Sequence, residues 1–303
     1  MNKQFRSSLI LILATLIWGS TFIPQRLAMA GMGPFTFQAI RCFLGVLALI
    51  PITLVSDRFK HDGKNFFTRW SDKKLWLGGL LCGVPLFLAC NLQQMGLVDT
   101  DAGKSAFLTA MYIVIVPIIG IFLKKKPSKM IPFSVILAVA GLYFLSCVGV
   151  TRISLGDLLL IGCALMFAVQ ITFVDIYAGQ VDAIRLNLLQ AAVCTILSAL
   201  VAMFTETTTW QAVLENWFPL CYAGVLSMGV AYCMQIFGQR DMEPSAASLI
   251  MSLESVFAVL CGVLILHETM SFWEIIGCIL LFAAVILSQL RIPNKRKQTE
   301  PKL

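Results

Sequence analysis

Two ionisable residues, Glu254 and Arg41, lie inside long apolar segments of the sequence. A charge at the centre of a bilayer costs at least about 2.5 kcal/mol, so such a group must be neutral, paired or facing water. Glu254 could exchange a proton or neutralise the amine of a ligand, or it could be a packing carboxylate bonded to neighbouring helices. Arg41 could pair with Glu254 or bind a ligand carboxylate. It could also reach toward the outer interface or bond backbone carbonyls.

Neutral polar and aromatic side chains are expected at depths in the membrane similar to those of Glu254 and Arg41. The amides are Gln93, Gln170, Gln190 and Gln235. They could hydrogen-bond a zwitterion without a permanent charge, or join helices for about 0.6 kcal/mol per bond. The aromatic candidates are Trp18, Tyr112 and Tyr232. They could stack on a flat or cationic ligand, or pack as ordinary core residues. Together with Glu254 and Arg41, these side chains form the expected binding site.

Lys104 begins an apolar segment at the outer face and follows Gly103. The run Gly103-Lys104-Ser105 is similar to the end of a phosphate-binding loop, but Val98 stands where that loop requires glycine. We therefore expect no nucleotide site. Lys104 could be a cation at the mouth of a cavity that attracts acidic groups, or the solvated end of a helix.

All ten cysteines fall inside the expected membrane spans, and none falls in a loop. This distribution argues against a disulfide framework and against a zinc site, and it favours small packing residues. We expect no metal and no cofactor. The cysteines are Cys42, Cys82, Cys90, Cys147, Cys163, Cys194, Cys221, Cys233, Cys261 and Cys278.

Apolar residues dominate the whole chain. Hydrophobic residues make up 58% of its 303 residues, charged residues make up 13%, and the mean hydropathy is +0.85. A soluble chain carries about 25% charged residues. Apolar runs of about 20 residues recur from end to end, which predicts an all-α polytopic membrane protein. The ten expected spans are 8–28, 35–55, 74–97, 103–123, 130–150, 155–176, 186–204, 216–238, 245–266 and 271–290.

The Lys and Arg residues set the orientation, because cytoplasmic segments carry more of them. With a cytoplasmic N-terminus, 19 of the 23 Lys and Arg residues fall on inside segments. Only Arg26, Lys104 and Arg152 fall on outside ends, and Arg41 lies within a span. We expect both termini on the cytoplasmic side of a bacterial cell membrane. The lipid bilayer is the expected partner, and the net charge of +7 does not require nucleic acid.

A weak internal repeat divides the chain. Residues 91–146 lie over residues 233–288 without a gap when every position shifts by 142, which places Gln93 on Gln235 and Tyr112 on Glu254. Each copy would have five spans, and an odd number turns the second copy upside down in the membrane. We expect repeats at residues 1–150 and 151–303. The acidic turns at 98–102 and 239–244 then lie on opposite faces, which excludes an enzyme site built from both.

Two motifs lie near the ends of the chain. The first comprises Trp18-Gly19-Ser20-Thr21-Phe22, Gly33-Pro34-Phe35 and Arg41. The second comprises Ala246-Ala247-Ser248-Leu249-Ile250, Leu253-Glu254-Ser255-Val256-Phe257, His267-Glu268 and Gly277. Together they resemble the EamA family of the drug/metabolite transporter superfamily, although Ser255 stands where many members have proline. The resemblance implies ten helices in two inverted five-helix repeats, a central cavity, and the export of metabolites or drugs.

We therefore expect a secondary transporter that exports small metabolites, such as amino acids or amphipathic or cationic compounds, by alternating access. A proton or an exchange substrate could drive it, and we expect no enzymatic activity. Two other classes stay open. A membrane-embedded enzyme acting on a lipid would need catalytic groups clustered on one face. A channel, or a sensor that transports nothing, would lack substrate exchange.

Overall fold

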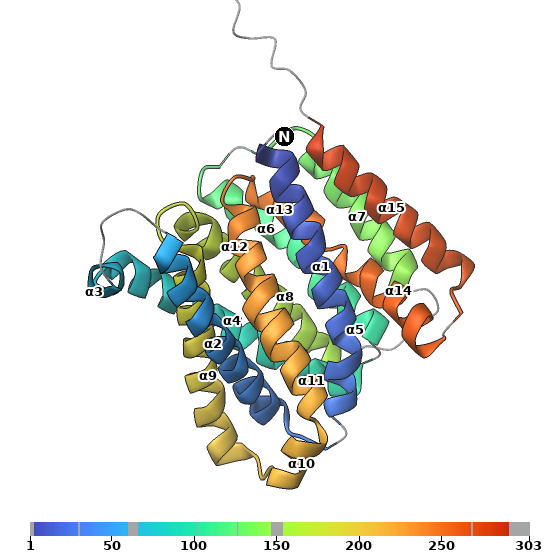
Figure 1. The fold of residues 1–303 in the computed structure, drawn as a ribbon. Coiled ribbons are helices and arrows are strands. Elements are labelled where there is room, and N and C mark those ends of the chain that lie inside the picture. The colour runs from blue at the N-terminus through green and yellow to red at the C-terminus, as the bar shows by residue number, and fades with distance from the viewer. Residues whose placement is uncertain are drawn as a thin grey trace, which may run out of the picture.

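The computed structural model describes residues 3–29, 31–59, 66–100, 102–125, 127–146, 154–267 and 269–290. All regular structure among these residues is helical, and the helices pack side by side in one bundle (Figure 1). The first half contains α1 (Lys3–Ala28), α2 (Pro34–Phe59), α3 (Phe66–Trp70), α4 (Lys73–Asp99), α5 (Ala102–Ala110), α6 (Tyr112–Phe122) and α7 (Ile131–Ser146). The second half contains α8 (Leu155–Tyr177), α9 (Ala183–Thr205), α10 (Trp210–Glu215), α11 (Trp217–Cys221), η1 (Tyr222–Ala231), α12 (Tyr232–Gln239), α13 (Pro244–Met251), α14 (Glu254–Leu266) and α15 (Phe272–Gln289).

The predicted all-α polytopic fold is confirmed. Within the described residues nine helical stretches are long and apolar enough to cross a bilayer, and the shorter apolar helix Ile131–Leu145 is a tenth candidate. Large apolar side chains on the outside of the bundle, such as Phe122 and Phe204, are exposed, as a lipid-facing surface requires. The expected repeat boundary at residues 150 and 151, together with Asp101, Arg152 and the basic tail, lies outside the described residues.

Contacts between helix ends show that the second half is inverted. Gln4 donates to Gln289 at 2.9 Å, so α1 begins on the same face of the bundle where α15 ends (Figure 1). We call this the terminal face and the other the far face. Helix α1 crosses to the far face and α2 returns, and the end of α2 meets the start of α9 through an Asp57–Arg185 ion pair of 2.5 Å. Since α9 starts on the terminal face, α8 starts on the far face, opposite to α1.

Two contacts lie where the copies meet. The Tyr112 hydroxyl donates to Glu254 at 3.3 Å, and Cys90 Sγ lies 3.6 Å from the Tyr232 hydroxyl. Both pairs are separated by 142 residues, so each joins a residue to its own counterpart in the other copy. Only positions on a pseudo-twofold axis can do this, and the axis therefore passes beside these four side chains.

The first two helices of each copy follow a different shift. A Cβ built on Gly96 would lie 2.6 Å from Leu160, and a Cβ built on its counterpart Gly238 would lie 2.6 Å from Leu11. Leu11 and Leu160 are therefore equivalent, which is a shift of 149 residues from α1 to α8. The first copy has seven more residues than the second between its second and third membrane helices, since 149 − 142 = 7. Those residues belong to the connection that contains α3.

Two expected spans are each broken into two helices, which continuous apolar runs did not predict. The break between α5 and α6 lies at Met111, and the break between α13 and α14 lies at Ser252 and Leu253, of which Leu253 is the counterpart of Met111 in the 142-residue frame. Around them the backbone makes tighter bonds between residues three apart, such as Leu253 to Ile250 at 3.1 Å and Val114 to Met111 at 3.0 Å. The second break forms although Ser255 stands in place of proline.

The middle of the eighth span is a π-helix, η1, of 10 residues. Such a segment does not pair its carbonyls as an α-helix does, and long π-helices are rare outside functional sites. Gly224 lets α2 approach it closely, because a Cβ there would lie 2.8 Å from Arg41 O. Side chains from α2 and α9 donate to its carbonyls, Arg41 to Ala223 and Asn187 to Met228, so neighbouring helices stabilise the wide turn.

Helices α7 and α15 form an antiparallel pair at one edge of the bundle (Figure 1). Their backbones touch, because a Cβ on Gly277 would lie 2.6 Å from Gly141 O. Neither helix contributes a residue to the cavity described below. The pair therefore covers the cavity-forming helices on the lipid side.

Candidate functional site

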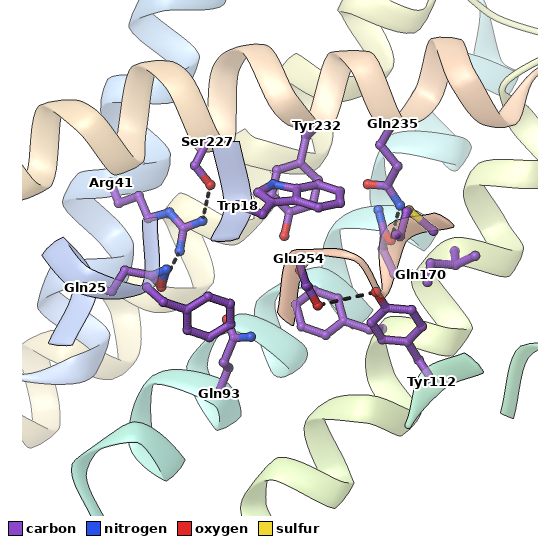
Figure 2. A pocket seen from close by; sticks show the side chains of 14 residues that line it. Trp18, Gln25, Arg41, Gln93, Tyr112, Gln170, Ser227, Tyr232, Gln235 and Glu254 are labelled. Carbon is purple, nitrogen blue, oxygen red and sulfur yellow. Dashed lines mark hydrogen bonds between the residues drawn. The ribbon is translucent and has the colours of Figure 1, made fainter. Parts of the chain in front are cut away.

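A cavity lies where the two copies meet, with about 480 Å³ of empty space that includes its opening to solvent. Eight of the nine side chains expected at the binding site line it, and Gln190 does not. The lining residues are Trp18, Phe22, Gln25, Arg41, Gln93, Tyr112, Phe167, Gln170, Ile171, Ser227, Tyr232, Gln235, Met251 and Glu254 (Figure 2).

The cationic end of the cavity is built around Arg41, which is 4% exposed. Its Nε donates to Ala223 O at 3.3 Å, and its Nη2 donates to Ser227 Oγ at 2.8 Å. Its Nη1 donates to Gln25 Oε1 at 3.3 Å and to Gln38 Oε1 at 3.4 Å. All four acceptors are neutral, and no carboxylate among the described residues forms an ion pair with Arg41. One of its five N–H groups and its whole charge are left for a ligand.

Glu254 occupies the first position of α14, where the broken helix restarts. Backbone N–H groups at a helix start have no partner within the helix, and the helix dipole there favours a carboxylate. The residue is 7% exposed, and its Oε1 accepts from Tyr112 at 3.3 Å. Gly19 allows α1 to pack against this turn, since a Cβ on Gly19 would lie 2.7 Å from Glu254 O. The break in the ninth span therefore aims a carboxylate into the cavity.

Aromatic rings line the cavity between the two polar ends. Trp18 packs edge-on against Tyr232, with ring centroids 5.1 Å apart and planes at 60°. Tyr112 meets Phe167 in the same manner at 6.4 Å and 72°. The indole Nε1 of Trp18 is buried, and no acceptor among the described residues reaches it. The rings supply apolar surface, and Trp18 supplies one unused donor.

Amides form the end of the cavity opposite Arg41 (Figure 2). Gln235 Nε2 donates to Gln170 Oε1 at 3.1 Å, and Gln170 Nε2 donates to Gln190 Oε1 at 3.2 Å. Gln93 stands apart from them and donates to Thr109 Oγ1 at 3.4 Å. The cavity therefore has a charged end and a neutral, hydrogen-bonding end.

The family model described as "EamA-like transporter family" matches residues 6–147 and again residues 154–290. These two matches cover both halves of the bundle. The chain belongs to the EamA-like transporter family. The sequence resemblance is thereby confirmed, and the protein is a membrane transporter with a small-molecule substrate.

Similar proteins extend along nearly the whole EamA-like chain. A protein named "Uncharacterized transporter" from Archaeoglobus fulgidus is 33% identical over 291 residues, which cover 96% of this chain and 88% of that protein. "Uncharacterized transporter YoaV" from Bacillus subtilis is 22% identical over 296 residues, covering 94% and 97%. A solved structure described as "Crystal structure of protein" has the same fold, with a TM-score of 0.78 at 17% identity, covering 94% of this chain and 96% of that one.

Two of the residues expected at the site of this EamA-like protein lie elsewhere. Lys104 does not line the cavity and instead forms a 2.5 Å ion pair with Asp157 at the start of α8. Its charge is therefore balanced by the protein, unlike that of Arg41. Gln190 is fully buried behind Gln170 and reaches the cavity only through that hydrogen bond.

Several lining residues had no distinctive signal in the sequence. Ser227 lies in an apolar run, Gln25 lies near the end of the first span, and Phe22 and Phe167 are ordinary members of apolar segments. The shift of 149 residues accounts for the positions of Phe22 and Phe167 in the cavity wall, because it places Trp18 on Phe167 and Phe22 on Ile171. A complete repeat alignment would therefore have found Phe167.

The cysteines provide no metal centre among the residues that the structure describes. Cys42 and Cys194 are buried side by side, with 3.3 Å between their sulfurs, and Cys90 meets Tyr232. These thiols pack between α2, α4, α9 and α12, behind the cavity wall. Cys147 lies outside the described residues.

Proposed function

We propose that this chain is a secondary transporter that exports small zwitterionic, amphipathic metabolites across the cytoplasmic membrane. Amino acids are the simplest compounds of this class. The transported molecule places its carboxylate at Arg41, its ammonium toward Glu254, and its apolar part against Trp18 and Tyr232.

The observation that carries this proposal is the charge of Arg41. A buried ion without an opposite charge costs several kcal/mol, and neutral hydrogen bonds offset only part of that cost. The guanidinium fork matches the two oxygens of a carboxylate. Glu254 lines the same cavity and supplies the charge that a substrate ammonium requires. A zwitterion would satisfy both groups at once.

The inverted copies support alternating access as the proposed mechanism. In such carriers one repeat rocks against the other around a fixed site near the bilayer midplane. The paired helix breaks at Met111 and at Ser252 and Leu253 are natural bending points beside the cavity. With both termini in the cytoplasm, as the distribution of Lys and Arg favours, the terminal face is the cytoplasmic one.

The first test is counterflow in liposomes that contain the purified protein. The panel comprises labelled amino acids, nucleosides and quaternary amines, and we expect saturable exchange of zwitterions. A channel gives no counterflow, and a lipid-modifying enzyme would change the lipid without exchanging solute. Absence of exchange for every compound would contradict the proposal.

Glu254 also carries the proposed coupling to protons. It can bind either the substrate ammonium or a proton, so an inward proton movement would release the substrate outward. We expect Glu254→Gln to weaken exchange, because the ammonium loses its counter-charge, and to make the exchange that remains independent of an imposed pH gradient. Uptake into everted vesicles, which corresponds to export, measures this. An unchanged response to the gradient would reject Glu254 as the coupling group.

A further inference from the structure

We propose that the amide end of the cavity is a subsite with fixed polarity, in which Gln235 Oε1 accepts an N–H from the ammonium of the transported molecule. The inference rests on the proposed function. It adds a neutral acceptor to the charged pair formed by Arg41 and Glu254. Asn187, which does not line the cavity, is the positioning residue that fixes this polarity through a chain of amides.

The chain of hydrogen-bonded amides begins at the π-helix. Asn187 Nδ2 donates to Met228 O and to Gly229 O, each at 3.0 Å. Backbone carbonyls only accept hydrogen bonds, so the NH₂ group of Asn187 must face them and its oxygen must point away. That oxygen accepts from Gln190 Nε2 at 2.8 Å. The orientation of Gln190 is therefore set by the π-helix and not by an arbitrary choice between oxygen and nitrogen.

The same constraint passes to the cavity. With its NH₂ committed to Asn187, Gln190 presents its oxygen to Gln170 Nε2 at 3.2 Å. Gln170 in turn presents its oxygen to Gln235 Nε2 at 3.1 Å. Reversing any one amide would place two oxygens or two NH₂ groups against each other. Gln235 is thus left with an oxygen and not an NH₂ group to offer a ligand.

That oxygen is unused by the protein. Gln235 is 2% exposed and lines the cavity, and no donor in the described part of the chain reaches its Oε1. A buried polar atom without a partner is costly, so a donor from the cavity should complete it. Figure 2 shows Gln235 and Gln170 at the end opposite Arg41, so the subsite suits a molecule whose ammonium is separated from its carboxylate by an apolar chain.

The test compares two probes in counterflow, 6-aminohexanoate and its N,N,N-trimethyl betaine. Both are zwitterions with the same chain of methylene groups, but only 6-aminohexanoate has N–H donors. For the wild type we expect exchange to favour 6-aminohexanoate. Gln235→Leu should lower the ratio of 6-aminohexanoate to betaine exchange about tenfold, because it removes an acceptor that the betaine never used. Each variant must first elute as a single peak in size-exclusion chromatography.

Gln239→Leu is the matched control. Gln239 is one turn further along α12, is equally buried, and donates to Ile171 O outside the amide chain. We expect it to keep the wild-type ratio. Asn187→Leu should lower the ratio because Gln190 is then free to turn over.

The outcomes separate this subsite from the proposed function. Exchange of 6-aminohexanoate with the same ratio to its betaine in the wild type and in Gln235→Leu would overturn the subsite alone. An equal fall in Gln239→Leu would also overturn it. If the wild type exchanges neither probe, and neither probe shifts its melting temperature, the zwitterion proposal is overturned together with the subsite.

Discussion

The two ends of the cavity occupy equivalent places in the two copies but contain different chemistry. The 149-residue shift places Gln38 on Asn187 and Arg41 on Gln190. In each pair the second residue donates to the first, at 3.4 Å in α2 and at 2.8 Å in α9. Both pairs also donate to carbonyls of η1. The residue positions correspond, but the contacts with η1 do not, because the twofold relation exchanges η1 with α4. A guanidinium in α2 stands where α9 has an amide, and this replacement makes one end of the cavity cationic.

The C-terminal ends of α2 and α9 also carry equivalent residues with different binding partners. On the terminal face Asp57 pairs with Arg185 at the start of α9. Its counterpart Glu206 on the far face accepts from the backbone of Phe35 and Thr36 at the start of α2, at 2.9 and 2.8 Å. An ion pair in one copy is a helix cap in the other. The carboxylate therefore keeps its position in both copies, while the group that it binds differs between them.

The largest expected effect comes from making the two cavity ends alike. Arg41→Gln removes the one cation among the described residues that line the cavity, and leaving a buried charge without its partner costs about 3 kcal/mol or more. Phenylalanine counterflow should fall at least about 100-fold. Phenethylamine, which lacks the carboxylate, should be affected far less. An equal loss for both compounds would show that Arg41 holds the helices together and does not select the substrate.

The ends of α2 and α9 should differ in their contribution to stability. Asp57→Asn leaves Arg185, which is 1% exposed, with Asp182 at 3.6 Å and the Trp70 ring at 5.5 Å, and should lower the unfolding free energy by about 3 kcal/mol. Glu206→Gln keeps one acceptor for the α2 backbone and should cost about 1 kcal/mol. Unfolding of the purified variants in detergent measures both. Similar costs would mean that Asp182 replaces Asp57 completely.

Apolar run length and the distribution of Lys and Arg were enough to predict the ten spans and the inverted fold, because bilayer thickness and charge act on sequence directly. The π-helix and the helix breaks were not predictable, since bonds from other helices, such as Asn187 to Met228, help to hold them. The depth of a residue identified most of the cavity side chains. It could not show that Lys104 pairs with Asp157, because that contact depends on how two helices pack.

A smaller effect should separate the two copies at the contact behind Glu254. Gly19 corresponds to Ala168 under the 149-residue shift, so the second copy already has a methyl group there. In the first copy that methyl would lie 2.6 Å from Phe257 Cβ and 2.8 Å from Ala258 N. Gly19→Ala should therefore cost about 2 kcal/mol of stability through overpacking.

Gly179→Ala is the control for this substitution, because a Cβ on Gly179 meets nothing within 4 Å. We expect its melting temperature in detergent to match that of the wild type. If Gly19→Ala melts at the same temperature as Gly179→Ala, α1 and α14 can separate without cost. The first copy would then tolerate a methyl group at this position as well as the second copy does.

The smallest expected effect concerns the two contacts on the pseudo-twofold axis. Tyr112 donates to Glu254 at 3.3 Å, within hydrogen-bond range, so a double-mutant cycle with Tyr112→Phe and Glu254→Gln should give a coupling of about 1 kcal/mol. Cys90 and Tyr232 are 3.6 Å apart through a weakly bonding thiol. The cycle with Cys90→Ala and Tyr232→Phe should therefore give coupling close to zero. Equal coupling energies in the two cycles would show that the Glu254 carboxylate adds no more to the contact between the copies than the Cys90 thiol does.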